Sequence, residues 1–191
     1  MDALKSILTI YTEATPNPET MKFVVNKMIL PAKSADFPTR ESAQHSPLAQ
    51  KLFDFNFVQG VFIMNNFVTV TKTAGTEWFD VNPILKEFIK AYVEAGDPIM
   101  LVETTDTDGF DENDPEVVQK IKELLHTHVK PAVEMDGGAI SFKSFNEGVV
   151  TVTLKGSCSG CPSSTITLKA GIEGLLKRMV PEVTEVVAEA M

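Results

Sequence analysis

The chain has very little cysteine, because Cys158 and Cys161 are the only two among its 191 residues. Two thiols separated by two residues cannot cross-link distant parts of a small secreted domain, which excludes a disulfide framework. The rest of the chain avoids thiols altogether. The closeness of this pair therefore points to chemistry on one loop.

The chain also lacks a long apolar run and a basic stripe. No segment approaches the ~18 uninterrupted apolar residues of a membrane span, and no row of Lys and Arg could neutralise phosphates. We therefore expect neither a membrane nor a nucleic-acid partner. The first sixteen residues contain an acid at Asp2 and no arginine, and their short apolar run fits a strand better than a signal-peptide core. From this we expect a cytoplasmic location.

The excess negative charge is concentrated in one short stretch. Residues 1–102 carry nine Lys and Arg against eleven Asp and Glu, residues 103–116 carry seven acids and no base, and residues 117–191 carry eight of each. The acidic stretch has one aromatic residue, one Gly and one Pro, so it cannot bury enough apolar surface to order itself. We predict two small α+β domains, at residues 1–102 and 117–191, joined by a solvated linker at 103–116.

Local patterns predict strands and two helices in the first domain. A helix is expected at 46–55, with Ser46 as its N-cap, and a second is expected to begin at Pro83 and end at Gly96. Two apolar runs flank Asn65-Asn66, and this pair of residues suits the tight turn of a hairpin. The expected strands are 6–14, 21–30, 57–64 and 67–73.

The second domain is predicted to have the order α-β-β-α-β. Apolar residues recur at helical spacing over 115–133, and Pro131 is expected to kink or end that helix. The turn Asp136-Gly137-Gly138 leads into a second hairpin. The remaining elements are strands at 139–145 and 149–155, a helix that begins at Ser163 or Ser164 and ends at about Val180, and a last strand at 183–187.

The two cysteines lie where strand 149–155 ends and the next helix begins. Free backbone N–H groups and the positive end of the helix dipole favour a thiolate over a thiol at such a place. Gly156 and Gly160 allow the backbone to turn tightly and to leave amide donors near the sulfurs. We therefore expect Cys158 and Cys161 to be reactive or metal-binding thiolates on an exposed loop.

A C-x-x-C pair has three interpretations. It could be the centre of a dithiol-disulfide oxidoreductase, although the longer βαβ unit typical of that function is missing. It could belong to a zinc-stabilised interaction module, but structural zinc needs four ligands. The nearby His126 and His128 are two apart on a predicted helix, so they point in different directions and could hardly serve one site.

The third interpretation is an iron–sulfur cluster, which is commonly held by four cysteine thiolates. One chain supplies only two, Cys158 and Cys161. The ligand set is complete if two copies meet around a two-fold axis, so that a single cluster bridges a homodimer. A cluster held in this way should be labile, which suits a carrier better than a permanent electron-transfer centre.

The segment 131–183 resembles the carboxyl-terminal domain of NifU. The resemblance runs from DGG at 136–138 through GSCSGCPSS at 156–164 to TLKAGIE at 167–173 and VPEV at 180–183. The preceding half resembles the companion amino-terminal domain of Nfu-type proteins; its matching segments are TPNP at 15–18, SPLA at 46–49, VTVTK at 68–72 and the residue Trp78. Together the two resemblances cover nearly the whole chain, and a match of this length is far more specific than a lone C-x-x-C.

This resemblance implies an iron–sulfur cluster scaffold or carrier without catalytic turnover of its own. Such a protein binds a [4Fe–4S] cluster between two subunits, works with the upstream cluster assembly machinery and passes the cluster to apo iron–sulfur proteins. The ligands of the family fall on Cys158 and Cys161, and a [2Fe–2S] cluster stays open as an alternative. Ser157 stands where Ala is usual and Ala139 where an acid is common, and neither departure removes a ligand. The first domain has no cysteine, and its task stays open.

Overall fold

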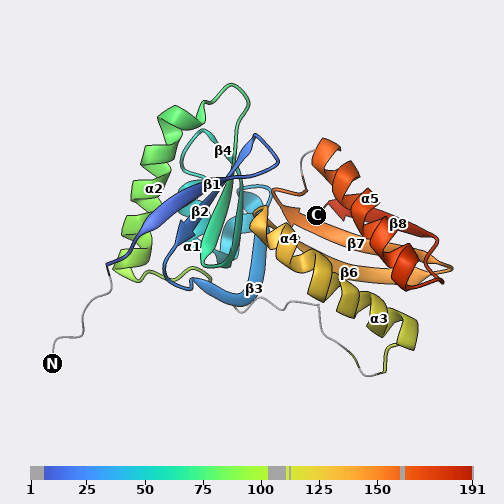
Figure 1. Cartoon of the computed structure of the whole chain (residues 1–191). Helices are drawn as coiled ribbons and strands as arrows, with labels where there is room; N and C mark the ends of the chain where they lie inside the picture. The colour runs from blue at the N-terminus through green and yellow to red at the C-terminus, as the bar shows by residue number, and fades with distance from the viewer. Residues whose placement is uncertain (1–6, 103–110, 112, 160–161, 191) are drawn as a thin grey trace. The chain divides into compact units, whose positions relative to one another are not determined.

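The computed structural model of the chain describes residues 7–102, 111, 113–159 and 162–190. Its contacts divide the chain into a first unit of residues 1–14 and 19–104 and a second unit of residues 15–18 and 105–191. Each unit combines helices with a β-sheet (Figure 1). The α+β class predicted from the sequence is therefore confirmed.

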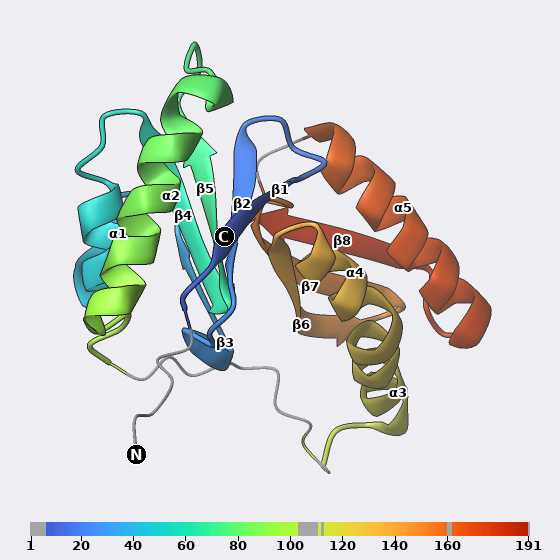
Figure 2. The same cartoon turned by 60° about the vertical axis from the view of Figure 1, so that its left-hand side comes forward.

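The first unit is built on a five-stranded sheet in the order β1-β2-β5-β4-β3, and every neighbouring pair is antiparallel. Helices α1 and α2 cover one face of this sheet (Figure 2). The fully buried Leu52 of α1 and Leu85 of α2 join the strand residues Phe23 and Ile63 in a single apolar cluster. The strands and helices are β1 Ile10–Ala14, β2 Thr20–Val25, β3 Leu30–Phe37, η1 Glu41–His45, α1 Pro47–Leu52, β4 Val58–Asn65, β5 Phe67–Lys72 and α2 Trp78–Ala95.

Three local predictions for this unit are confirmed. The hydroxyl of Ser46 accepts a hydrogen bond from the amide of Ala49 at 3.2 Å, as an N-cap does. Asn65 takes the left-handed conformation in the turn between β4 and β5, with φ of 48°. Gly96 ends α2 with φ of 75°, a conformation that glycine adopts without strain.

One prediction for the first unit is wrong, and one strand was missed. Helix α2 begins at Trp78 and includes Pro83, where the sequence had predicted its start. The extra turn is stabilised by packing, because Val81 is buried and the Trp78 ring contacts Phe23 edge to face at 6.5 Å between centroids. Strand β3 was not predicted, because it contains Pro, Lys, Ser and Asp and forms through pairing with β4.

The second unit places all its helices on one face of a three-stranded sheet. The strands lie in the order β6-β7-β8, with β6 and β7 antiparallel and β7 and β8 parallel. The buried residues Ile121, Val152 and Leu176 bring the first helical run, the sheet and the last helix into one core. The elements are α3 Glu116–Leu124, η2 Leu125–Val129, α4 Lys130–Met135, β6 Gly138–Asn146, β7 Val149–Gly156, α5 Pro162–Met179 and β8 Glu185–Ala190.

A π-helical segment, η2, connects α3 to α4. Pro131 has no amide hydrogen to donate to the carbonyl of Thr127, and its ring crowds that carbonyl in a regular helix. The chain adopts a wider turn just before the proline, in which the Lys130 amide donates to the Leu125 carbonyl. The helical run therefore continues to Met135, beyond the end that the sequence had predicted.

The predicted acidic linker lies mostly outside the described residues, which omit 103–110 and 112. Near its end the carboxylate of Asp114 pairs with Lys122 of α3 at 2.5 Å. The domain boundaries drawn from the sequence stay a prediction. In the part of the chain that the structure describes, no helix is long and apolar enough to cross a membrane.

Candidate metal centre

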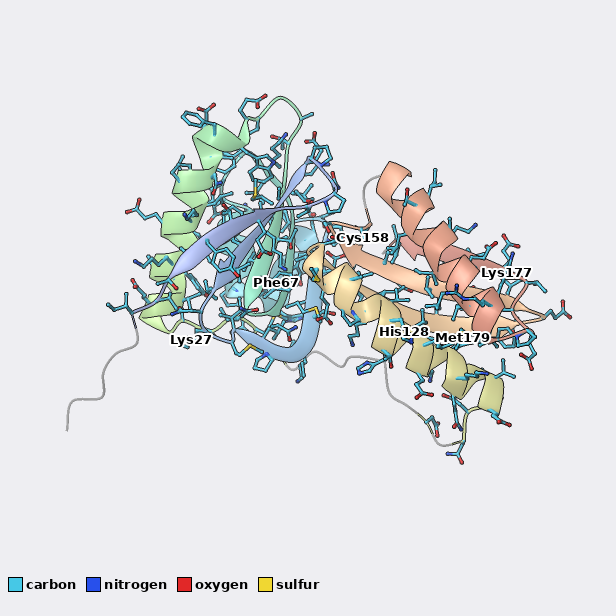
Figure 3. The ribbon with its side chains drawn as sticks, in the orientation of Figure 1. Lys27, Phe67, His128, Cys158, Lys177 and Met179 are labelled. Atoms are coloured by element: carbon cyan, nitrogen blue, oxygen red, sulfur yellow. The ribbon has the colours of Figure 1, made fainter. Side chains whose placement is uncertain are left out.

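The cysteine loop, residues 157–161, follows directly from the end of β7. Gly156 closes the strand with φ of 69°, and both the amide and the hydroxyl of Ser159 donate to its carbonyl oxygen, at 3.1 and 2.8 Å. Helix α5 begins at Pro162. Figure 3 shows Cys158 where β7 ends, at the opposite end of α5 from Lys177 and Met179.

The turn before β6 holds the cysteine loop from the neighbouring strand. Gly138 pairs with Gly156 across the sheet, and the amide of Ser157 donates to the Gly137 carbonyl at 3.4 Å. The hydroxyl of Ser157 donates to the carbonyl oxygen of Asp136. These bonds fix the start of the loop against a turn that is about twenty residues distant in sequence.

Cys158 points into the core of the second unit. The residue is 6% exposed and belongs to the same apolar cluster as the inward residues of β7 and α5. A Cβ atom added to Gly138 would lie 3.0 Å from Cys158 Sγ and 2.6 Å from the Lys155 carbonyl oxygen, so only glycine leaves room for the sulfur. The Thr165 hydroxyl of α5 donates to the Cys158 carbonyl at 3.0 Å.

The expectation of an exposed thiolate is wrong for Cys158. Burial raises the pKa of its thiol above the ordinary value of 9.0; the nearby hydroxyl of Ser157 opposes this shift, and the carboxylate of Asp136 adds to it. The physical reason is the direction of the side chain, which packs over Gly138 in the apolar cluster. The group at this position is therefore a buried thiol.

Cys161, the second predicted ligand, lies outside the described residues, as does Gly160. The structure consequently leaves the predicted partnership of Cys158 and Cys161 untested. The two histidines weighed as zinc ligands, His126 and His128, are both exposed and lie in the π-helical segment η2 (His128 is labelled in Figure 3). Within the described residues, no three His, Cys, Asp or Glu side chains gather where they could hold a metal ion.

Helix α5 is tied to β8 by charged side chains below the cysteine loop. The carboxylate of Glu173 accepts from Lys177 Nζ at 2.6 Å and from the Val186 amide at 3.1 Å. Both bonds hold the pKa of Glu173 below its usual value, and the bond from Lys177 has the larger effect. Lys169 pairs with Glu185 at 3.9 Å.

Three residues that contact Cys158 were not identified from the sequence, namely Ser157, Gly138 and Thr165. The signal for two of them lay in the hairpin register. Extending the ladder of β6 and β7 from their turn at 147–148 would place Gly138 opposite Ser157, beside the cysteine loop. A bulge between Phe142 and Ser144 shifts the register by one residue, so Gly138 pairs with Gly156 in the structure. For Thr165 there was no such signal, because its contact depends on how α5 packs.

Two family models match the chain and together cover most of it. Residues 10–96 match the amino-terminal domain of the scaffold protein Nfu/NifU, and residues 121–187 match the NifU-like domain. The chain belongs to the Nfu/NifU scaffold family. The resemblance identified from the sequence is therefore confirmed, and the cysteine loop lies in the part that matches the NifU-like domain.

Relatives of this Nfu/NifU chain are similar over nearly its whole length. The human mitochondrial NFU1 iron-sulfur cluster scaffold homolog is 42% identical over 91% of this chain and 69% of its own length. A NifU-like protein of Schizosaccharomyces pombe is 40% identical over 98% of this chain and 74% of its own length. The mitochondrial NifU-like protein 4 of Arabidopsis thaliana is 40% identical over 94% of this chain and 65% of its own length.

The expected cytoplasmic location is contradicted by these relatives. The human and Arabidopsis proteins are named mitochondrial, as is a relative from Drosophila ananassae that is 40% identical. Their names point to mitochondria rather than to the cytoplasm. The expectation rested on the first sixteen residues, which lack the core of a secretory signal peptide, and that observation does not distinguish the cytoplasm from mitochondria.

Proposed function

We propose that this chain binds an iron–sulfur cluster through Cys158 and Cys161 and delivers it to apo iron–sulfur proteins. The observation that supports this most directly is the C-x-x-C pair itself, which contains the only cysteines of the chain and stands in the NifU-like domain. Similar proteins from human and Drosophila are named iron-sulfur cluster scaffold homologs. The cluster is the cargo of such a protein, which needs no catalytic residue and no turnover.

The number of ligands favours a cluster shared between two chains. Four cysteine thiolates hold a [4Fe–4S] cluster in the common case, and one chain has two cysteines. We propose that two copies related by a two-fold axis provide the full set. Half of the ligands leave with each subunit, so this arrangement holds a cluster less firmly than one chain with four cysteines, which suits delivery.

Delivery is proposed to occur by ligand exchange. A cysteine thiolate of the recipient binds one iron while Cys158 or Cys161 leaves it, and the leaving thiolate takes a proton from solvent. No electron is transferred in this step. Repeated exchanges move the cluster without changing its charge, and they require the upstream assembly machinery only for loading.

The burial of Cys158 favours this function over that of a dithiol-disulfide oxidoreductase. Attack on a disulfide needs an accessible thiol whose pKa lies near the ambient pH. Burial raises the pKa of the Cys158 thiol and leaves the residue 6% exposed. A ligand thiol has to become accessible once for each cluster that is delivered, so it can be buried in between. A redox thiol has to react in every turnover and cannot be buried in this way.

The test is anaerobic reconstitution of the full chain, with iron, sulfide, zinc and particle mass measured together. We expect one [4Fe–4S] cluster per two chains. The variants Cys158→Ser and Cys161→Ser should remain folded and lose most of the cluster, because each removes two of the four thiolates in a dimer. Ser159→Ala, whose hydroxyl bonds the Gly156 carbonyl, is the matched control and should keep its cluster.

Other results identify the competing functions. A complete cluster on a monomer, or on Cys161→Ser, contradicts the shared site. Stoichiometric zinc without sulfide supports the interaction module, and reduction of insulin disulfides by the colourless protein supports the oxidoreductase. Mixing the loaded protein with an apo recipient should move iron and sulfide together, and retention of both on this chain would contradict delivery.

A further inference from the structure

Ser157 is buried directly beside Cys158 and has no role in the ligand set. The residue is 1% exposed. Its hydroxyl oxygen lies 3.8 Å from Cys158 Sγ, and its hydroxyl also donates to the carbonyl oxygen of Asp136. The contact between the Ser157 oxygen and Cys158 Sγ is a weak hydrogen bond in which either group can donate.

Gly138 holds the sulfur from the other side. The position of a missing Cβ atom at Gly138 is 3.0 Å from Cys158 Sγ, so the sulfur packs directly on this glycine. Cys158 is therefore seated between the Ser157 hydroxyl and the backbone of Gly138, inside the apolar cluster of the second unit. A cluster shared with another chain must reach the sulfur from outside this seat.

We propose that Ser157 is a positioning residue, whose hydroxyl holds the Cys158 side chain inward until metal binds the sulfur. This inference rests on the proposed function, because it takes Cys158 as a cluster ligand. When the side chain turns outward, the contact between Sγ and the Ser157 oxygen breaks. As the bond between sulfur and iron forms, the thiol proton passes to a base in solvent. Ser157 keeps its bond to Asp136, so the turn before β6 stays in place.

The inward position protects the unloaded chain. An exposed thiol three residues from Cys161 could oxidise to a disulfide or a sulfenic acid, and either product would destroy a ligand. A weak hydrogen bond with a thiol is enough to favour the inward position and can still be broken during loading.

The first test measures access to Cys158 in the cluster-free full chain with Cys161→Ser, which leaves a single thiol. Its reaction with iodoacetamide is followed at fixed pH over a wide range of reagent concentrations. If the side chain must turn outward before it reacts, the rate levels off at high reagent, because opening becomes the slow step. Ser157→Ala removes the contact with Cys158 Sγ together with the bond to the Asp136 carbonyl, and it should raise this limiting rate roughly two- to fivefold or more.

Three further variants distinguish an effect of the Ser157 hydroxyl on the position of the Cys158 side chain from an effect on the packing of the loop. Ser159→Ala removes a neighbouring hydroxyl that bonds the Gly156 carbonyl at 2.8 Å, and it should leave the rate unchanged. Ser157→Thr keeps the hydroxyl and should retain the parent rate. Ser157→Gly removes the hydroxyl with a different effect on packing and should match Ser157→Ala. All variants are compared by their unfolding midpoints.

Two results overturn the proposal. One is an equal limiting rate in the parent, Ser157→Ala and Ser157→Gly. The other is a displaced pH–rate profile with an unchanged limiting rate, because Ser157 would then act on the proton of the sulfur and not on its position. Neither result depends on iron.

The loading reaction distinguishes this proposal from the proposed function. With both cysteines present, Ser157→Ala should take up its cluster faster by a similar factor and reach the same final iron content. If the parent chain binds no iron at all, the proposed function fails while the alkylation result stands. If the parent loads and Ser157→Ala loads at the same rate, the positioning role fails alone.

Discussion

The two units differ in how their strands reverse direction. Every neighbouring pair of strands in the first unit is antiparallel, and β4 turns into β5 through Asn65 and Asn66 alone. In the second unit β8 runs parallel to β7, so the chain must leave the end of β7 and return along the sheet. Helix α5 makes that return, as parallel neighbours require.

This difference explains why the cysteines lie where they do. A tight hairpin pairs its backbone groups and has no room for a functional loop, whereas a crossover begins with an open loop and the unpaired amides of a helix start. A loop held by a rigid sheet is a common place for chemistry. The first unit has a core of apolar residues, and the second admits one thiol into its core at the crossover.

The largest expected effect comes from removing one core leucine from each unit. Leu85 of α2 and Leu176 of α5 are both fully buried, so Leu85→Ala and Leu176→Ala should each destabilise their own unit by about 2–5 kcal/mol. Only Leu176→Ala should weaken cluster retention. Trp78 fluorescence reports unfolding of the first unit, since it is the only tryptophan, and amide exchange in β7 reports the second. Identical shifts of both signals by either variant would mean that the units unfold together.

A smaller effect is expected at Gly138, on which the sulfur of Cys158 packs. Gly138→Ala places a methyl group against the Lys155 carbonyl and Cys158 Sγ, so urea unfolding should show a loss of about 1–3 kcal/mol in the second unit. Gly171→Ala in α5 is the matched control, because a Cβ there meets nothing within 4 Å. That variant should gain about 0.5–1 kcal/mol from helix propensity. Equal free energies of unfolding for Gly138→Ala and Gly171→Ala would show that a methyl group at position 138 is not crowded by its neighbours.

The smallest effect concerns the acid stability of the second unit. The folded pKa of Glu173 is lowered, first by its bond from Lys177 and then by that from the Val186 amide. Its contribution is therefore fully present above the unfolded pKa, near 4.5, and is lost as pH falls through the lower folded pKa. Glu173→Gln should lower the unfolding midpoint of the second unit at neutral pH and converge with the parent in acid. A constant difference at every pH would contradict this linkage.

The sequence predicts the features that depend on neighbouring residues. The Ser46 cap, the turn at Asn65 and the end of α2 at Gly96 are all local, and the structure contains each of them. Strand β3 depends on pairing with β4, and the early start of α2 depends on Trp78 packing against Phe23, so neither has a local signal.

The candidate site was predictable in its residue types but not in its geometry. The spacing of Cys158 and Cys161 left three interpretations open, and the resemblance to the NifU domain selected the iron–sulfur one. The inward direction of Cys158 depends on Gly138, which is brought beside it by the pairing of β6 with β7. The raised pKa of the thiol follows from that burial, and a rule based on the helix start gives the opposite sign.

The π-helical segment sets the length of chain that leads to β6. Leu125, Val129 and Val133 are all buried at intervals of four residues, and a regular helix would rotate each one about 40° past the last. The wider turn cancels this drift, so it acts as one inserted residue that keeps three apolar side chains in line. An inserted residue of this kind leaves the helix on either side of it in phase. The helical run can therefore pass Pro131 without turning its apolar face away from the core.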